Sequence, residues 1–424
     1  MSAASTSIAL SDLTTDHFVQ TFEGHPPAGT FTRSMLPDDT PIPHLFRPLA
    51  LRTQAKGKDS DGHSSDVVLR NRVVVSPMCQ YSARDGFVSP WHLAHLGSFA
   101  IHGAGSLMTE ASAVTPEGRI TPQDVGIWTD DQAHAHKDVV ASLKRISDKF
   151  TVGIQIAHAG RKGSTWSPYY RGKRVHKEYV TKEEGGYPDD VVGPSAVPYG
   201  PNWITPRELS RDDIKRLQQA FVDAAQRSYE VAGYDFVEVH SAHGYLLHSF
   251  LSPLANKRTD EYGGSFENRV RFLLETVRAI KQRWPHRSLW VRISATDFAE
   301  HLEPEQETWN VESSIKLGQL LEKEDVDYLD VSAGGQCCRE SLTRRVEMLL
   351  LTRLLPLYAR LDSPAADSAR SGLPTRLCSQ DQSSPSHCPI QRTLLPSARQ
   401  LPGRPDARAR GAHGRRRRWP HGRR

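Results

Sequence analysis

The sequence feature that most constrains the fold lies at residues 234–245, where a short apolar run ends in two histidines and a tyrosine. The run follows Gly233, and its residues Phe-Val-Glu-Val lead into His240, His243 and Tyr245. Such a run of aromatic and β-branched residues is typical of a strand that is buried on both faces. In parallel α/β barrels, polar residues at the ends of buried strands form the working face. This stretch therefore predicts a parallel α/β protein with its site at the strand ends.

Strand-like and helix-like segments alternate up to about residue 335. We expect strands at residues 71–75, 106–114, 151–162, 234–240, 289–294 and 326–332, the third of them ending in polar residues. We expect helices at residues 92–102, 133–149, 212–231, 267–284 and 311–323, with Ser210 and Asp213 forming a capping box before the third. Because the connections between parallel strands are right-handed, this alternation of strands and helices can form either a doubly wound sheet or a closed barrel. Functional residues on many different strands favour the barrel.

Charge divides the chain near residue 336. Residues 336–424 contain 18 Arg, no Lys and 6 acidic residues, a net charge of about +12, whereas residues 1–335 carry about −7. Four of the 5 cysteines lie in the basic segment, and only Cys79 lies before it. We therefore predict an N-terminal arm (1–40), a barrel domain (41–335) and an Arg-, Pro- and Ser-rich tail (336–424).

Targeting signals are not evident in the sequence. No apolar run reaches the length of a membrane span, and the N-terminal residues lack the basic start and apolar centre of a secretory signal. We therefore expect a cytoplasmic protein that does not bind membranes.

The predicted strand ends carry neutral hydrogen-bonding side chains and one cation, without a carboxylate pair, a Ser-His-Asp set or a phosphate loop. The neutral side chains are Tyr81, Thr109, Gln155, His240, His243 and Tyr245, and the cation is Arg292. This set suits a bound cofactor that performs the difficult step while the protein orients the substrate and stabilises charge. An amide can pair with the edge of a flat heterocycle, and a nearby Arg stabilises a negatively charged reduced ring.

Several longer motifs occur in a characteristic order. They are Ser76-Pro-Met-Cys-Gln-Tyr81, Glu110-Ala-Ser-Ala-Val, Gly118-Arg-Ile-Thr, Gly153-Ile-Gln-Ile-Ala-His-Ala-Gly-Arg-Lys162, His240-Ser-Ala-His243-Gly-Tyr245, residues 258–264 with Asn268-Arg269, and Val291-Arg-Ile-Ser294. Together they resemble the Old Yellow Enzyme family of flavin-dependent ene-reductases, in the branch with a Ser-Pro-Met-Cys flavin loop and paired histidines. The resemblance covers residues 45–335. It implies an FMN-binding (β/α)8 TIM barrel that is reduced by NADPH or NADH and reoxidised by an activated alkene.

The resemblance also implies roles for individual residues. The implied cofactor contacts are Ser76, Pro77, Met78, Cys79, Ala111, Gln155 and Arg292. His240 and His243 would hydrogen-bond the carbonyl or nitro oxygen of the substrate, where two donors stabilise the charge that develops in the transition state. Tyr245 would protonate the α-carbon, and Tyr81 would help to hold the substrate.

Each of these residues also has a plainer interpretation. His240, His243 and His248 could form part of a zinc site, but no Cys or acidic ligand lies close by in the sequence, so we expect no metal. Taken alone, Cys79 is a small buried hydrophobe and Arg292 an ordinary ion-pair residue. The Ser-Pro-Met-Cys-x-Tyr context favours the functional interpretation of Cys79, and the cost of an Arg inside an apolar strand favours a designated partner for Arg292. The long segment 164–206, with its aromatic residues, is predicted to be a lid or substrate loop.

The tail is the part of the chain that the resemblance does not cover. The family continues through two more strands whose loops bind the cofactor phosphate, and nothing after Gly335 matches them, so the barrel is predicted to be incomplete after strand six. The abrupt change in residue usage favours a frameshifted or mis-spliced tail. The alternative is a catalytically impaired barrel remnant whose basic tail binds a polyanionic partner. The Arg run has no interleaved aromatics, so we expect a small activated alkene rather than nucleic acid as the partner, and a homo-oligomer is left open.

Overall fold

The structure is a computed structural model of the 424-residue chain. It describes residues 28–29, 36–37, 40–51, 67–146, 150–170, 178–300 and 307–336. The predicted arm and the predicted tail therefore lie almost wholly outside the described residues.

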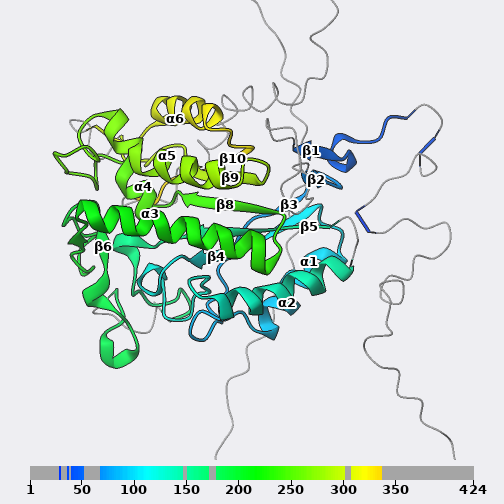
Figure 1. Ribbon diagram of the computed structural model, residues 1–424, viewed down its shortest axis with the longest axis horizontal. Helices are drawn as coiled ribbons and strands as arrows, with labels where there is room; N and C mark the ends of the chain where they lie inside the picture. The colour runs from blue at the N-terminus through cyan, green and yellow to red at the C-terminus, as the bar shows by residue number, and fades with distance from the viewer. Residues whose placement is uncertain are drawn as a thin grey trace, which may run out of the picture. The chain divides into compact units, whose positions relative to one another are not determined.

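A parallel sheet of six strands forms the centre of the described part of the chain (Figure 1). Its strands are β3 (Val74–Val75), β4 (Ser106–Ala113), β5 (Thr151–Ala157), β8 (Phe236–Ser241), β9 (Ser288–Ser294) and β10 (Tyr328–Ser332). They are ordered β10-β9-β8-β5-β4-β3, so each pairs with its neighbour along the chain. A doubly wound sheet reverses its strand order at a switch point, whereas a barrel adds each strand on the same side. The described strands therefore form a curled half-barrel, and the doubly wound alternative is wrong.

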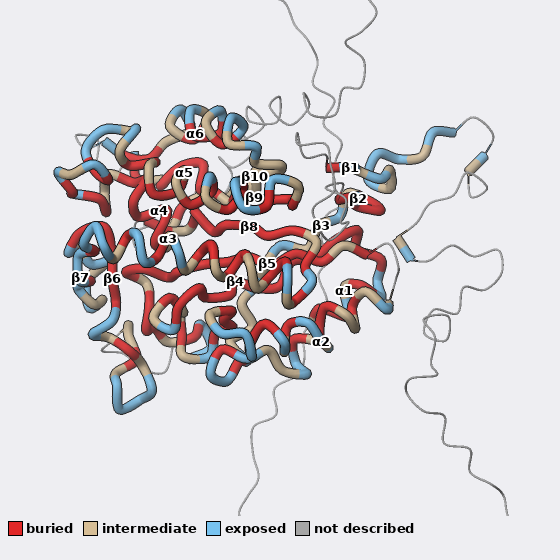
Figure 2. Tube along the Cα trace, viewed as in Figure 1, coloured by how far each residue is buried: buried red, intermediate tan, exposed pale blue. Residues whose placement is uncertain are grey.

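Amphipathic helices cover the outer face of this sheet. They are α1 (Pro90–Ile101), α2 (Asp130–Ile146), α3 (Arg211–Gln226), α5 (Phe266–Arg283) and α6 (Val311–Lys323). Their apolar side chains join Val237, Val239 and Val291 of the sheet in one continuous buried cluster. Figure 2 shows the strands buried beneath helices whose outer faces are exposed.

The third helix begins as its sequence predicts. The hydroxyl oxygen of Ser210 accepts a hydrogen bond from the backbone N–H of Asp213 (3.1 Å), and the Asp213 carboxylate accepts one from the backbone N–H of Ser210 (3.0 Å). This capping box supplies partners for backbone donors that a helix start leaves unpaired. The helix then ends in a π-helical turn at Arg227–Ala232 instead of continuing as regular α-helix to residue 231.

An antiparallel hairpin closes the amino-terminal end of the inner face of the sheet. It consists of β1 (Leu49–Leu51) and β2 (Val67–Leu69), whose side chains pack in one cluster with Met108, Phe236 and Trp290. The rings of Phe236 and Trp290 stack with their centroids 3.9 Å apart. In Figure 1 the hairpin lies at one end of the strands, and β6 (Val192–Gly193) lies towards the other.

The predicted strands and helices all occur, with small changes in their bounds, and the helix at Val311–Lys323 has the bounds expected for it. The structure adds the β1–β2 hairpin, the short buried helix α4 (Leu246–Leu251) and the small parallel pair of β6 with β7 (Arg207–Glu208). None of these was predicted, because elements of two to six residues are too short to show a period.

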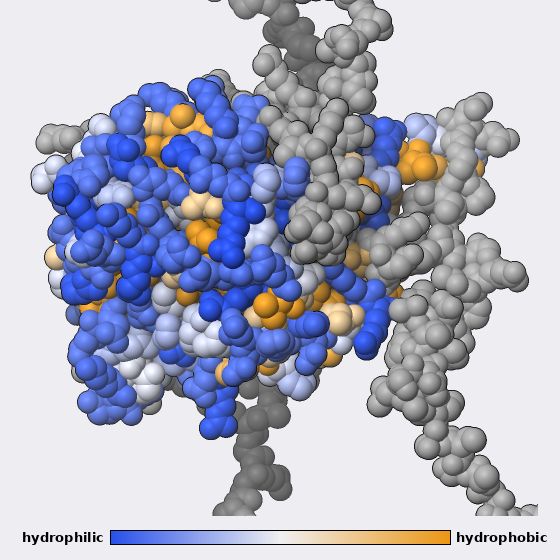
Figure 3. Space-filling model, viewed as in Figure 1, coloured by the Kyte–Doolittle hydropathy of each residue, from blue (hydrophilic) through white to orange (hydrophobic). Residues whose placement is uncertain are grey.

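The face of the molecule in Figure 3 is mostly hydrophilic, with scattered apolar residues. Among the residues that the structure describes, no helix is long and apolar enough to span a bilayer.

Candidate active site

A layer of polar side chains crosses the inner face of the sheet above the hairpin. Gln155 lies opposite Glu238 in the β5–β8 register, and Arg292 lies opposite both His240 and Asp330 in the registers of its two neighbouring strands. Residues two apart in a strand point to the same face. Glu238 and His240 therefore both face inward, while Val237 and Val239 face the helices. This alternation brings together Gln155, His240 and Arg292, which the sequence had placed at strand ends.

Charge in this layer is buried and partly paired. Gln155 donates its side-chain amide to Glu238 (Nε2–Oε1 2.7 Å), and Arg292 lies 3.3 Å from Asp330 (Nε–Oδ2). Burial raises the pKa of Glu238, Asp330 adds to the rise, and Arg292 opposes it. The second carboxylate oxygen of Glu238 is buried without a hydrogen-bond partner in the described part of the chain, and the buried Nε of Arg292 makes the ion pair with Asp330 but no hydrogen bond there. Buried polar atoms without partners are rare, so this layer has the character of a binding site.

The two predicted histidines are neutral hydrogen-bonding groups. Burial lowers the pKa of His243 to about 3, and the positive charge of Arg292 contributes. Burial also lowers the pKa of His240 well below its ordinary value, with further contributions from His243 and Arg292. The Nδ1 atom of His240 accepts a hydrogen bond from the backbone N–H of Ala242 (3.3 Å). The ring proton of His240 therefore lies on Nε2, which is a donor.

His243 stands in a strained turn that the chain holds from several sides. Its φ is 58°, and its backbone N–H donates to the hydroxyl oxygen of Ser294 (2.9 Å). Its Nε2 lies 2.6 Å from the hydroxyl oxygen of Ser332, so this ring nitrogen already has a partner within the chain. The next residue, Gly244, has a φ of 74°, and a Cβ there would lie 1.8 Å from the carbonyl oxygen of Gly335. Only glycine fits between the histidine turn and the end of the described chain.

Tyr81 and Tyr245, which the sequence predicts to hold and protonate a substrate, line one cavity of about 150 Å³. The ring of Tyr245 packs edge-on against His240 and His243, with centroid distances of 5.0 and 6.5 Å. Trp166 and Trp203 of the segment 164–206 also line the cavity. The segment that is predicted to be a lid therefore contributes aromatic side chains to the cavity, and its role as a lid stays a prediction.

Lys162 is a residue of this cavity that the sequence quoted only as the end of a motif. Its ammonium group donates to the carbonyl oxygens of His243 (2.8 Å) and Gly335 (3.0 Å). It also lies 4.1 Å from the centroid of the Tyr199 ring and 5.4 Å from that of Tyr245. Lys162 therefore links the end of β5 to the histidine turn. Its position directly after the Ala-Gly-Arg of the strand-end motif was the available signal.

The predicted flavin loop follows β3. Within residues 76–79, Ser76 is exposed, Met78 is 44% exposed, and Cys79 is partly buried. Burial raises the pKa of the Cys79 thiol well above its ordinary value, and the negative charges of Asp124 and Glu110 add to the rise. The loop leaves an exposed apolar side chain beside a thiol that stays protonated.

Beneath this loop lies a buried carboxyl group whose role the sequence did not reveal. Glu110 accepts a hydrogen bond from the backbone N–H of Gln80 (3.0 Å) and lies 3.7 Å from His92 (Oε2–Nε2). Burial raises the pKa of Glu110 to about 8. Ala111 follows directly, buried at the irregular register of β4 between Thr109 and Ser112. The network therefore joins β4, which carries Ala111, to the flavin loop.

Two other histidine and hydroxyl groups have structural partners away from this cavity. Thr109 hydrogen-bonds Tyr234 (Oγ1–Oη 2.9 Å), which in turn hydrogen-bonds His136 of α2 (Oη–Nδ1 2.7 Å). The prediction that Thr109 belongs to the site is therefore wrong, because its hydroxyl is used in this buried network. His248 accepts from the backbone N–H of Gly244 (2.9 Å) and lies 3.2 Å from Asp297. It supports the histidine turn from behind instead of joining the two histidines.

Comparison with known proteins identifies the group to which this arrangement belongs. The sequence profile described as the NADH:flavin oxidoreductase / NADH oxidase family matches residues 64–335. The chain belongs to this family. The family match and the predicted resemblance both end at residue 335.

Members of the Old Yellow Enzyme family resemble the chain in sequence and in structure. A NADH:flavin oxidoreductase of Gibberella zeae is 43% identical over 317 residues, which cover 73% of this chain and 70% of the relative. The NADPH dehydrogenase of Bacillus subtilis is 41% identical over 272 residues, covering 64% and 71%. Morphinone reductase is 28% identical with a TM-score of 0.53, covering 68% of this chain and 71% of its own. An Old Yellow Enzyme from Pichia is 26% identical with a TM-score of 0.53, covering 68% and 70%.

The predictions of the family, of a flavin-dependent oxidoreductase and of flavin and nicotinamide cofactors are thereby confirmed. The described residues fit a flat flavin ring. Exposed Met78 offers an apolar surface for such a ring to cover, and Arg292, whose Nε makes an ion pair with Asp330 but no hydrogen bond among the described residues, offers a cation. The family match ends at residue 335, so it includes no counterpart of the two further strands that the resemblance implied for the cofactor phosphate.

Proposed function

We propose that this oxidoreductase uses NADPH or NADH to reduce the C=C bond of α,β-unsaturated carbonyl or nitro compounds. The observation that supports this most is the grouping of two neutral histidines with Tyr245, which lines the same cavity as Tyr81. FMN, when bound, supplies the hydride that adds to the β-carbon of the alkene. The protein's own part is to hold the substrate, stabilise the oxygen on which charge develops, and deliver a proton.

His240 is the better placed of the two donors for that oxygen. Its Nε2 carries the proton of a neutral ring, and a buried neutral donor stabilises a developing oxyanion strongly because water does not compete. His243 makes the second contact once the substrate oxygen replaces the Ser332 hydroxyl at its Nε2. Because both rings stay neutral far below neutral pH, the clamp does not depend on histidine protonation.

Tyr245 is the proton donor in this proposal. Its ring borders the cavity and packs against both histidines, so a substrate whose oxygen is held by the histidines presents its α-carbon towards it. The proton leaves the phenol as the enolate collapses to the saturated product, and solvent restores it. Cys79, Ala111, Gln155 and Arg292 are proposed to contact the flavin, with Arg292 stabilising negative charge on the reduced ring.

The test is to purify the full chain, record its visible absorption, and measure NADPH oxidation driven by cyclohex-2-enone. The proposal expects a flavin spectrum and alkene-dependent oxidation. A colourless protein that remains inactive after addition of FMN would refute it for this chain.

A double replacement of the clamp separates the two half-reactions. His240→Ala with His243→Ala should spare flavin reduction by NADPH and slow alkene turnover by about 100-fold or more, the scale seen when oxyanion donors are removed. His134→Ala is the matched control, because His134 is exposed on α2. Equal loss in both half-reactions would contradict the oxyanion role.

A further inference from the structure

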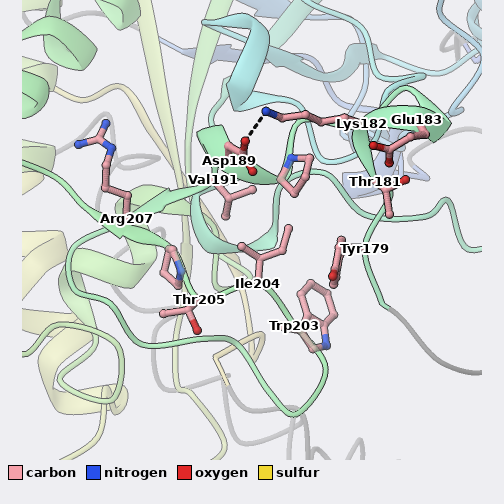
Figure 4. A pocket seen from close by; sticks show the side chains of 12 residues that line it. Tyr179, Thr181, Lys182, Glu183, Asp189, Val191, Trp203, Ile204, Thr205 and Arg207 are labelled. Carbon is pink, nitrogen blue, oxygen red and sulfur yellow. Dashed lines mark ion pairs between the residues drawn. The ribbon is translucent and has the colours of Figure 1, made fainter.

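Two hollows share a wall at Trp203. The inner hollow is the cavity of about 150 Å³ that Tyr81 and Tyr245 border, and the outer one has a volume of about 700 Å³. Trp203 lines both. Figure 4 shows its indole beside Tyr179 in the outer hollow. The walls of the two hollows also meet at a second place. Thr165, which lines the inner hollow, forms an antiparallel β-bridge with Tyr179, which lines the outer hollow.

The local sequence fixes the position of Trp203. Residues 200–203 form a tight turn in which the backbone N–H of Trp203 donates to the carbonyl oxygen of Gly200 (3.2 Å). Pro201 and Asn202 are the central residues of the turn, and Asn202 has a φ of 68°. Proline followed by a residue that tolerates positive φ is typical of a type II turn. The indole then packs edge-on against Tyr199, with their centroids 4.7 Å apart.

The outer hollow has the chemistry of a site for a neutral substituent. Its two cations are already paired, Lys182 with Asp189 (dashed line in Figure 4) and Arg207 with Asp213 at 2.7 Å. Its other walls include the apolar side chains Val191, Ile204 and Pro206. An apolar group would gain by leaving water here, whereas an anion would have to compete with existing ion pairs.

Volume separates the roles of the two hollows. Small-molecule sites usually have about 300–1,000 Å³, and the inner cavity, at about 150 Å³, is smaller than this range. The outer hollow, at about 700 Å³, falls within it. A small ring or short-chain alkene suits the inner cavity, and a longer substrate requires both.

We propose that Trp203 is a specificity-determining partition, which limits the substrates to small activated alkenes and closes off an outer subsite for a neutral aromatic substituent. This inference rests on the proposed function for the identity of the substrate. It adds the residue that sets the size limit and the space that a larger substrate would use.

The test compares a short and a long alkene, cyclohex-2-enone and 4-phenylbut-3-en-2-one. Trp203→Ala joins the two hollows and should raise kcat/KM for the long alkene relative to the short one by about tenfold or more, because a phenyl ring is then buried. The gain should come mainly from KM. Trp203→Leu should give a smaller gain, and Trp203→Phe, which keeps a ring in place, should behave as the wild type.

Refilling the outer hollow provides the decisive control. Thr205 borders the outer hollow only and is exposed, so Thr205→Trp added to Trp203→Ala should cancel the gain for the long alkene. Persistence of the gain in this double variant would show that the phenyl ring does not enter the outer hollow. An unchanged ratio of kcat/KM in both Trp203→Ala and Trp203→Leu would overturn the partition.

A binding measurement distinguishes failure of this inference from failure of the proposed function. Calorimetric titration with the saturated ketone 4-phenylbutan-2-one needs no turnover, and Trp203→Ala should bind it about tenfold more tightly than the wild type. If neither alkene drives NADPH oxidation but this tightening occurs, the proposed reaction fails and the partition stands. If the alkenes are reduced but binding and the ratio of kcat/KM are unchanged, the partition fails and the reaction stands.

Discussion

Replacing Glu110 by Gln tests the electrostatics beneath the flavin loop. The carboxylate accepts a hydrogen bond from the backbone N–H of Gln80 (3.0 Å) and lies close to His92. An amide has nearly the same shape and keeps an oxygen for Gln80, but it cannot ionise. The substitution therefore removes the titration of this site and retains its main hydrogen bond.

The magnitude follows from the raised pKa of Glu110, about 8 in the folded protein against an ordinary value of 4.5. Between these two pH values the folded state keeps a proton that the unfolded chain releases. The contribution to stability is therefore complete below pH 4.5 and is lost as the pH rises through 8. Linkage gives a loss of about 1.6 kcal/mol in the free energy of unfolding between about pH 6.5 and pH 8. The E110Q variant lacks this loss.

The assay is urea unfolding of the wild type and E110Q at both pH values, followed by tryptophan fluorescence. The difference between the two proteins should shift by about 1.6 kcal/mol in favour of E110Q on going to the higher pH. Taking this difference removes the titration of every other group that the two proteins share. Glu322→Gln is the control, because Glu322 is exposed on α6. A difference that stays constant with pH would refute the reasoning.

Cys79 supplies a second measurement on the same variant. After burial and the charge of Asp124, the charge of Glu110 is the next contribution that raises the pKa of the Cys79 thiol. E110Q should therefore let Cys79 react with iodoacetamide at a lower pH than in the wild type. Mass spectrometry of the peptide that contains Cys79 measures this without interference from the cysteines after residue 336. If the pH dependence of Cys79 alkylation is the same in both proteins, the charge of Glu110 does not act on the Cys79 thiol.

Three further predictions concern the site and its support. Tyr245→Phe should slow alkene turnover by about 100-fold while stopped-flow reduction of the flavin by NADPH is unchanged, and equal slowing of both would contradict the proton-donor role. Gln155→Leu leaves buried Glu238 without its hydrogen-bond donor and should lower the urea-derived free energy of unfolding by about 1–3 kcal/mol, whereas no loss would mean that the hydrogen bond contributes little. Burial lowers the pKa values of His92 and His136 to about 4. The stability that each neutral ring contributes is therefore complete above pH 6.5, and each histidine should lower the free energy of unfolding by about 1.4 kcal/mol per pH unit as the pH falls from 6.5 towards 4. His136→Asn should flatten this acid dependence in thermal melts, and an unaltered slope would contradict the assignment.

Sequence reasoning could predict a candidate site because the relevant signals are local. In β8, Val237 and Val239 alternate with Glu238 and His240, and the apolar run ends at the predicted site residue His240. A buried strand whose polar residues share one face can be recognised without knowing its neighbours. The family resemblance then supplied the roles of residues whose types alone leave several interpretations open.

What the sequence could not supply are relations between distant segments. The β1–β2 hairpin joins residues 49–51 to residues 67–69, each too short to show a period of two. The role of Lys162 depends on the His243 and Gly335 carbonyl oxygens, which lie 81 and 173 residues away along the chain. The wall at Trp203 depends on two hollows whose lining residues come from segments far apart in the sequence, such as Tyr81, Lys162 and Tyr245 of the inner one.

The inner face of the sheet shows why the candidate site lies at one end of it. From the hairpin outward, β9 presents Trp290, Arg292 and Ser294, and β10 presents Tyr328, Asp330 and Ser332 in the same register. Each strand therefore runs from a ring, through an ionisable group, to a hydroxyl. The rings cover the hairpin end, and the partly buried charges in the middle position, Arg292 and Asp330, pair with each other within their own layer. The hydroxyls and histidines at the other end can exchange their partners for a substrate. Shifting a strand by one residue would turn all three positions toward the helices, so the alternation that builds the core also fixes the site.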